Sequence, residues 1–258
     1  MEIIGYIGAF LMGIVLGAIG SGGSILTVPL LVYLFNVTPT IATGYSLLIV
    51  GITAFIGAIR YYTKGMIDIR SATIFAIPSI AMTYITRAYI MPNIPDNILG
   101  IDRDSSIMFL FAALMIVSAF MMYKDSHFSN KRNVDISHPK FLIILEGIVV
   151  GFITGLLGAG GGFLIMPALV LLMKMPISMA IGSSLFIISL KSLIGFVGDL
   201  QSGIIIQMPM ILYFIICTVI GMIIATKYFS SKKDMLRQKF FAIFTALVAI
   251  FIVLKEIF

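Results

Sequence analysis

Two glycine-rich stretches that repeat each other constrain this chain more than any other feature. The second reads Gly151-Phe-Ile-Thr-Gly-Leu-Leu-Gly-Ala-Gly-Gly-Gly-Phe-Leu-Ile-Met-Pro167, and the first begins at Gly13. One offset, the difference between positions 13 and 151, relates Gly13, Gly17, Gly20, Gly22, Gly23, Leu26 and Pro29 to Gly151, Gly155, Gly158, Gly160, Gly161, Leu164 and Pro167. The same offset continues through the pairs Ala42/Ala180, Gly44/Gly182, Ser46/Ser184, Gly57/Gly195 and Gly65/Gly203. Chance does not keep glycines in one register, so the chain is a tandem duplication.

Both stretches lie inside long apolar runs. Of 258 residues, 60% are hydrophobic and 11% are charged, against roughly 45–50% and about 25% in soluble domains. This composition excludes an ordinary soluble protein and predicts eight hydrophobic segments. They cover residues 3–35 (broken at Gly20–Ser24), 40–62, 71–91, 105–123, 141–173 (broken at Gly158–Gly162), 178–200, 207–225 and 240–257.

The charged loops indicate that the two copies face opposite ways. In the first copy the loop after residue 62 is basic, whereas its counterpart in the second copy holds only Asp199. The next loop reverses the pattern, because Lys227, Lys232, Lys233 and Arg237 follow residue 225. If basic loops mark the cytoplasm, the repeats are inverted, a plan that places the substrate at mid-membrane. Re-entrant broken segments would then leave both termini outside.

The sequence therefore predicts an all-α polytopic membrane protein of two inverted repeats with four hydrophobic segments each. The first repeat covers residues 1–123, a polar linker covers 124–140, and the second repeat covers 141–258.

The breaks themselves are candidate anion sites. A helix that restarts after a break presents unpaired N–H groups and the positive end of its dipole. The predicted substrate-binding positions in the breaks are Ser21, Gly22, Gly23 and Ser24 in the first copy and Gly160, Gly161 and Gly162 in the second. If the inverted repeats bring the two tips together, they form one pocket for a small oxyanion. The alternative is that these glycines only allow helices to pack closely, which we favour for Gly13/Gly17 and Gly151/Gly155.

Lys191 lies near the middle of the segment 178–200, where a lysine costs about 2.5–3.5 kcal/mol. We favour direct contact with the anion. A structural ion pair with Asp199 or Glu146, or a role in proton coupling, stays open.

Other polar residues admit two interpretations each. Ser46, Ser183 and Ser184 follow the breaks and could face the same pocket or bond back to helix carbonyls. Asp199 could relay protons or couple an ion, or simply lie at the interface. Arg60, Arg87 and Lys174 stand near segment ends, where snorkelling is the favoured interpretation.

Catalytic and cofactor chemistry has little support. His127 and His138 fall in the polar linker without metal-ligand spacing, and no Walker or nucleophile-elbow motif occurs. The sequence predicts no catalytic residue, no metal and no cofactor. Cys217 is the single cysteine, so no disulfide forms within the chain.

The doubled Gly-x-Gly-Gly-(Gly/Ser)-x(4)-Pro signature, at Gly20–Pro29 and Gly158–Pro167, resembles that of the TauE/SafE sulfite exporter family. So do Ala42–Ser46, Ala180–Ser184 and Leu190–Gly195. The resemblance covers nearly the whole chain. It implies a secondary transporter (permease) in the cytoplasmic membrane of a prokaryote, and a substrate such as sulfite or an organosulfonate.

We therefore expect alternating-access transport of a small anion at the repeat interface. The rival functions are an anion channel and a structural membrane subunit without transport. The expected partners are the anionic substrate and the lipid bilayer, with no nucleic acid, and a homodimer stays open.

Overall fold

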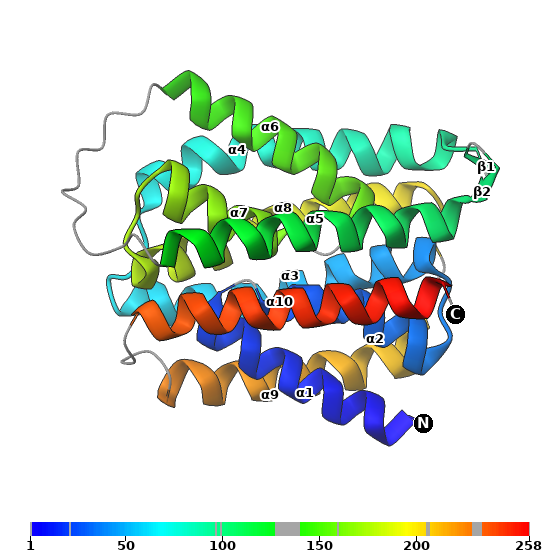
Figure 1. The fold of residues 1–258 in the computed structure, drawn as a ribbon, viewed down its shortest axis with the longest axis horizontal. Coiled ribbons are helices and arrows are strands. Elements are labelled where there is room, and N and C mark those ends of the chain that lie inside the picture. The colour runs from blue at the N-terminus through cyan, green and yellow to red at the C-terminus, as the bar shows by residue number, and fades with distance from the viewer. Residues whose placement is uncertain are drawn as a thin grey trace.

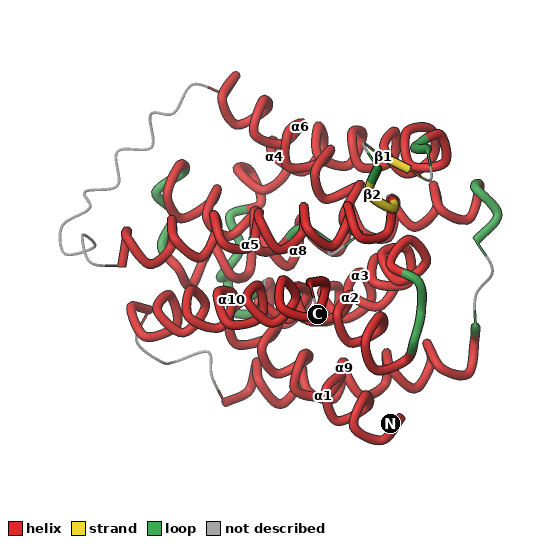
Figure 2. Tube along the Cα trace, turned by 45° about the vertical axis from the view of Figure 1, so that its right-hand side comes forward, coloured by secondary structure: helices red, strands yellow, loops and turns green. Residues whose placement is uncertain are grey.

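The computed structural model describes residues 2–20, 22–95, 97–98, 100–126, 140–158, 160–204, 207–228 and 234–257. Figure 2 shows a molecule built almost entirely of helices joined by short loops. The first half comprises α1 (Glu2–Ile19), α2 (Gly22–Phe35), α3 (Pro39–Thr63), α4 (Ile69–Ile85), the π-turn η1 (Thr86–Ile90), the 3₁₀ turn η2 (Met91–Asn93) and α5 (Arg103–Ser126). The second half comprises α6 (Lys140–Leu157), α7 (Gly162–Pro167), the π-turn η3 (Ala168–Leu172), α8 (Ile177–Gln201), α9 (Met208–Tyr228) and α10 (Asp234–Ile257). Two short antiparallel strands, β1 (Asn97–Ile98) and β2 (Ile101–Asp102), form a hairpin before α5.

The prediction of an all-α membrane protein is confirmed. Five helices are long and apolar enough to cross a bilayer: Pro39–Thr63, Ile69–Asn93, Arg103–Met121, Ile177–Gln201 and Met208–Tyr228. Their bounds lie within a few residues of the predicted segments. The last predicted segment is the helix α10, although it is not among these five.

The first broken segment is a re-entrant hairpin. The chain turns at Gly20, and α2 packs back along α1, so that the ring of Phe35 lies against Gly5 and the side chain of Leu30 against Gly8. In the second half, α7 likewise runs back toward the end of the bundle at which α6 began (Figure 1). Each hairpin therefore makes no net crossing.

Both ends of the described chain lie at the same end of the bundle (Figure 1), which we name the terminal end. The helix α3 starts there, whereas α8 starts at the opposite end. Contacts along the two helices agree: Gly44 meets Asp199, Gly51 meets Leu193, and Gly57 meets Leu185. The central helices of the two halves are thus antiparallel.

The two halves are interleaved rather than side by side. The helix α1 packs most extensively on α9 of the other half, and α6 packs on α4; α3 pairs with α8, and α5 with α10. Equivalent glycines make equivalent contacts with the other half: Gly13 lies on the backbone of Thr218, and Gly151 lies on the backbone of Ser79. Neither half buries its apolar faces alone.

The outer surface of the bundle is apolar. Large hydrophobic side chains are exposed along the helices, for example Leu11 at 51%, Phe141 at 70% and Leu247 at 62%. In water such a surface would drive aggregation, but in a bilayer it faces lipid tails.

Candidate functional site

The second break has a backbone that only glycine adopts readily. Gly158, Gly160 and Gly161 all have positive φ, at 67°, 60° and 64°, a conformation in which a Cβ atom is disfavoured. The helix α7 then starts at Gly162, within one residue of the predicted restart. The cluster of glycines is therefore required by the turn itself.

Lys191 lies at this break. Its side chain is fully buried, and its Nζ donates a hydrogen bond to Thr154 Oγ1 at 2.6 Å. A Cβ atom on Gly161 would stand 2.7 Å from the same Nζ. Lys191 on α8 thus places its side-chain amino group at the glycine backbone. Thr154, which lies beside it, was not predicted from the sequence.

Two polar groups at this break lack a partner that a ligand could supply. In the part of the chain that the structure describes, no carboxylate lies within ion-pair distance of Nζ, because Asp199 pairs with Arg87 instead. The neighbouring Ser192 Oγ is buried without a hydrogen-bond partner and would stand 3.2 Å from a Cβ on Gly160. The ion pairs suggested for Lys191, with Asp199 or Glu146, are therefore absent.

The first break is narrower than predicted. Gly20 has a φ of 81°, Ser21 lies outside the described residues, and α2 already includes Gly22, Gly23 and Ser24. These three residues were predicted to lie in the break. The N–H groups of a first helical turn have no acceptor within the helix, so these residues can be helical and still present their N–H groups.

The serines that follow the breaks have different partners. Ser184 Oγ lies 3.1 Å from the Gly20 carbonyl oxygen and 2.9 Å from that of Ile181, so it braces the first break. Ser183 Oγ accepts a hydrogen bond from the Asp68 backbone N–H at 3.0 Å. Ser46 Oγ is buried without a hydrogen-bond partner. Of the three, Ser46 retains a free hydroxyl.

The tips of the two breaks contact α8 at neighbouring heights. Gly20 lies against Ile181, whereas Gly160 lies against Ile188. These two residues of α8 are separated by about 10 Å of helix at 1.5 Å per residue. The half-helices α2 and α7 also pack together. The single pocket predicted between the tips stays a prediction.

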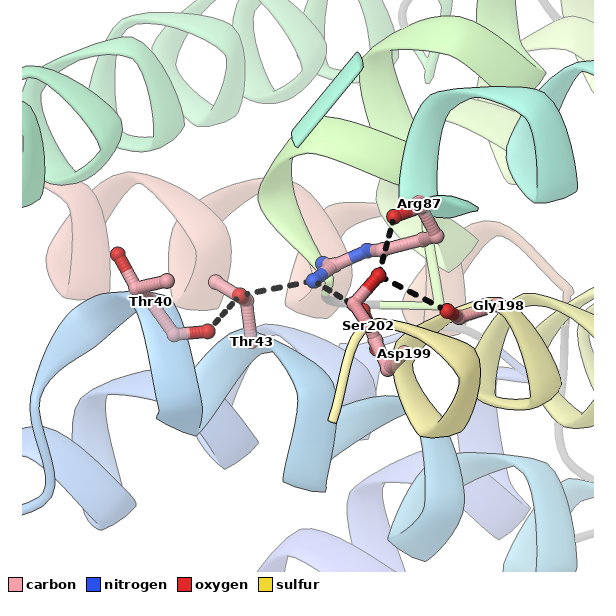
Figure 3. A network of polar contacts seen from close by, with 6 residues as sticks. All are labelled: Thr40, Thr43, Arg87, Gly198, Asp199 and Ser202. Carbon is pink, nitrogen blue, oxygen red and sulfur yellow. Dashed lines mark hydrogen bonds and ion pairs between the residues drawn. The ribbon is translucent and has the colours of Figure 1, made fainter. Parts of the chain in front are cut away.

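The favoured interpretation of Arg87 as a snorkelling residue is wrong. Arg87 does not snorkel to the interface: it is 1% exposed, at the junction of α4 with the π-turn. Figure 3 shows its guanidinium pointing toward the first turn of α3, where Nη1 donates to Thr43 Oγ1 at 3.1 Å and to Asp199 Oδ1 at 3.4 Å. Nothing in the pattern of the segment separates a buried arginine from a snorkelling one, so this pair was not predicted.

A cavity of about 570 Å³ lies beside this pair at the terminal end. Its polar lining consists of Thr40, Tyr45, Arg87, Arg103, Asp199, Ser202 and Gln207. Thr43 joins the cavity to the second break, because it receives the Arg87 hydrogen bond and also packs against Gly158. Among the described residues, no group of histidine, cysteine and carboxylate side chains could hold a metal ion.

Comparison with known proteins agrees with this architecture. The model of the family "Sulfite exporter TauE/SafE" matches residues 6–252. A probable membrane transporter protein of Xylella fastidiosa is 31% identical over 95% of this chain and 92% of its own length. One from Bacillus subtilis is 30% identical over 74% and 77%, and one from Methanocaldococcus jannaschii is 28% identical over 75% and 70%. No solved structure matches the chain.

Proposed function

Because this chain belongs to the sulfite exporter TauE/SafE family, we propose that it is a secondary transporter of sulfite or a related sulfur oxyanion or organosulfonate. Its family and its relatives make it a multi-pass membrane transporter. The anion, the alternating-access mechanism and a prokaryotic cell membrane as its location are the proposal.

The observation that carries the proposal is the environment of Lys191. A positive charge alone in a low-dielectric interior is costly, so Lys191 would carry its charge when an anion is bound beside it. Its hydrogen bond to Thr154 supplies an oxygen but no countercharge. A small anion bound between Nζ, Ser192 Oγ and the glycine backbone would supply one.

The arrangement of the halves supports alternating access. The hairpins enter from opposite ends, and the exchanged contacts of α1 and α6 couple the halves across the bundle. Small residues at these contacts, such as Gly13 and Gly151, let helices approach closely. Movement of one half against the other would open the break to one side at a time.

The test is sulfite flux into proteoliposomes that contain the purified protein. We expect the wild-type flux to saturate with sulfite concentration. Lys191→Met, which removes the charge at similar volume, should abolish it. Thr154→Val should reduce the flux about tenfold, by removal of one hydrogen bond to a charged group, and Thr154→Ser should retain it. Wild-type flux in correctly folded Lys191→Met would overturn the proposal.

A further inference from the structure

The Arg87–Asp199 pair has unused hydrogen-bonding capacity beside a cavity that lies apart from Lys191. Arg87 uses Nη1 for its hydrogen bonds to Thr43 and Asp199, while its Nε and Nη2 are buried without a hydrogen-bond partner. Nε and Nη2 lie on one edge of the planar guanidinium, which is the geometry that binds two oxygens of one anion. A buried donor left unpaired is costly, so an edge with two such donors favours a ligand.

The ion pair is held loosely. The single Nη1···Oδ1 distance is 3.4 Å, compared with about 2.7–2.9 Å in a good charge-assisted bond. Asp199 Oδ2 has no hydrogen-bond partner and lies beside Gly44, where a Cβ would stand 3.1 Å away. An arriving anion that binds the free edge would therefore compete with only a weak partner for the guanidinium charge.

The pair belongs to one end of the molecule only. The repeat offset places Tyr61 at the position equivalent to Asp199, and Tyr61 donates its hydroxyl to the Gly17 carbonyl. Gly13 lies on Thr218 and its equivalent, Gly151, lies on Ser79, so Thr218 and Ser79 are equivalent positions. Eight residues further along each helix, Thr226 is therefore the equivalent of Arg87. The duplication thus left this charged pair without a counterpart at the other end.

We propose that the cavity at the terminal end is an oxyanion vestibule, in which Arg87 binds the anion through Nε and Nη2 and Asp199 is the competing counter-ion. Its volume of about 570 Å³ is in the range of small-molecule sites. Asp199 follows Lys191 on α8 by eight residues, about 12 Å of helix. The vestibule would hold the anion before or after its passage at Lys191, so this inference rests on the proposed function.

The experiment measures sulfite and sulfate binding to the detergent-purified protein by calorimetry, at constant ionic strength. Lys191→Met serves as the background, because it removes the amino group at the break and leaves the vestibule intact. We expect this variant to bind sulfite still. Adding Asp199→Asn should tighten its binding about tenfold or more, since the competing charge is gone. Adding Arg87→Lys keeps the positive charge but removes the pair of parallel donors, so it should weaken sulfite binding by a similar factor.

Arg87→Met together with Asp199→Asn is the neutral control, because it leaves no charge buried alone. In the same background it should remain folded in gel filtration and lose sulfite binding. If Lys191→Met binds no sulfite, or if Asp199→Asn leaves its affinity unchanged, the pair is structural and the vestibule is wrong. If these binding results hold but the wild type shows no flux, the proposed function fails and the vestibule stands.

Discussion

At the scale of single residues, Gly161 shows why the second break is built of glycine. Its φ of 64° disfavours any side chain, and a Cβ there would meet Thr154 Cγ2 as well as Lys191 Nζ. Two separate costs, backbone strain and a steric clash, therefore act on any substitution.

We predict that Gly161→Ala lowers the thermal stability of the detergent-purified protein more than Gly65→Ala does. Gly65 is the matched control, because its φ of 67° imposes the same backbone cost, about 1–2 kcal/mol, with no atom within 4 Å of the added Cβ. Equal shifts of the melting temperature would contradict the close packing of Gly161 against Thr154 and Lys191.

Single residues also show what sequence could and could not predict about the site. Lys191 was identifiable because a lysine in the middle of an apolar segment has no route to water. Arg87 stands near the end of its segment, where the same sequence fits either snorkelling or burial. Thr154 was missed because a threonine inside a membrane helix satisfies itself by bonding to a carbonyl, so its type alone predicts nothing.

At the scale of helices, the contacts between α1 and α9 and between α6 and α4 depend on small residues. A Cβ on Gly13 would meet the Thr218 carbonyl oxygen, and one on Gly151 would meet the Ser79 carbonyl oxygen. Backbone atoms cannot rotate away as a side chain can, so the helices must separate.

We predict that Gly13→Ala and Gly151→Ala each destabilise the folded protein by about 1–3 kcal/mol, the usual cost of overpacking. Leu11→Ala is the control on α1, because Leu11 is 51% exposed and faces lipid rather than α9. Thermal unfolding in detergent gives the comparison. If Leu11→Ala is as damaging as Gly13→Ala, the close contact of α1 with α9 does not set the stability.

The helices themselves were largely predictable, and their arrangement was not. The segment predicted at 40–62 is α3, Pro39–Thr63, because apolar length fixes a membrane helix. The position of the first break depends on length too, because the 18 residues of α1 rise about 27 Å before the turn at Gly20. Sequence showed the break but not how deep the preceding helix would place it.

At the scale of the whole molecule, the charges are distributed unevenly between the two ends. The helices α3, α5 and α9 end, and α4 and α6 start, at the end opposite the termini (Figure 1). The basic residues at these helix ends and just after η3 are Lys64, Arg70, Lys124, Lys140, Lys174 and Lys227. At the terminal end, the basic residues Arg103 and Lys255 are accompanied by the acidic residues Asp102, Asp104 and Glu256. The positive-inside rule then places the basic end in the cytoplasm and the vestibule on the outer side.

We predict this orientation for single-cysteine variants in a Cys217→Ser background. Thr38→Cys, at the start of α3, should react with a membrane-impermeant maleimide on intact cells. Thr63→Cys, at the end of the same helix, should react only after the cells are permeabilised. Both positions are exposed. The reverse labelling pattern would show that the protein has the opposite orientation in the membrane.

Counterflow in proteoliposomes tests the central claim, carrier transport of a small anion at Lys191, most directly. Vesicles loaded with unlabelled sulfite are diluted into a trace of labelled sulfite, and internal label is followed over time. A carrier that exposes its site to one side at a time gives a transient accumulation above equilibrium, and we expect this from the wild type and not from Lys191→Met. Label that only equilibrates, whatever the internal sulfite, would contradict the account and indicate a channel.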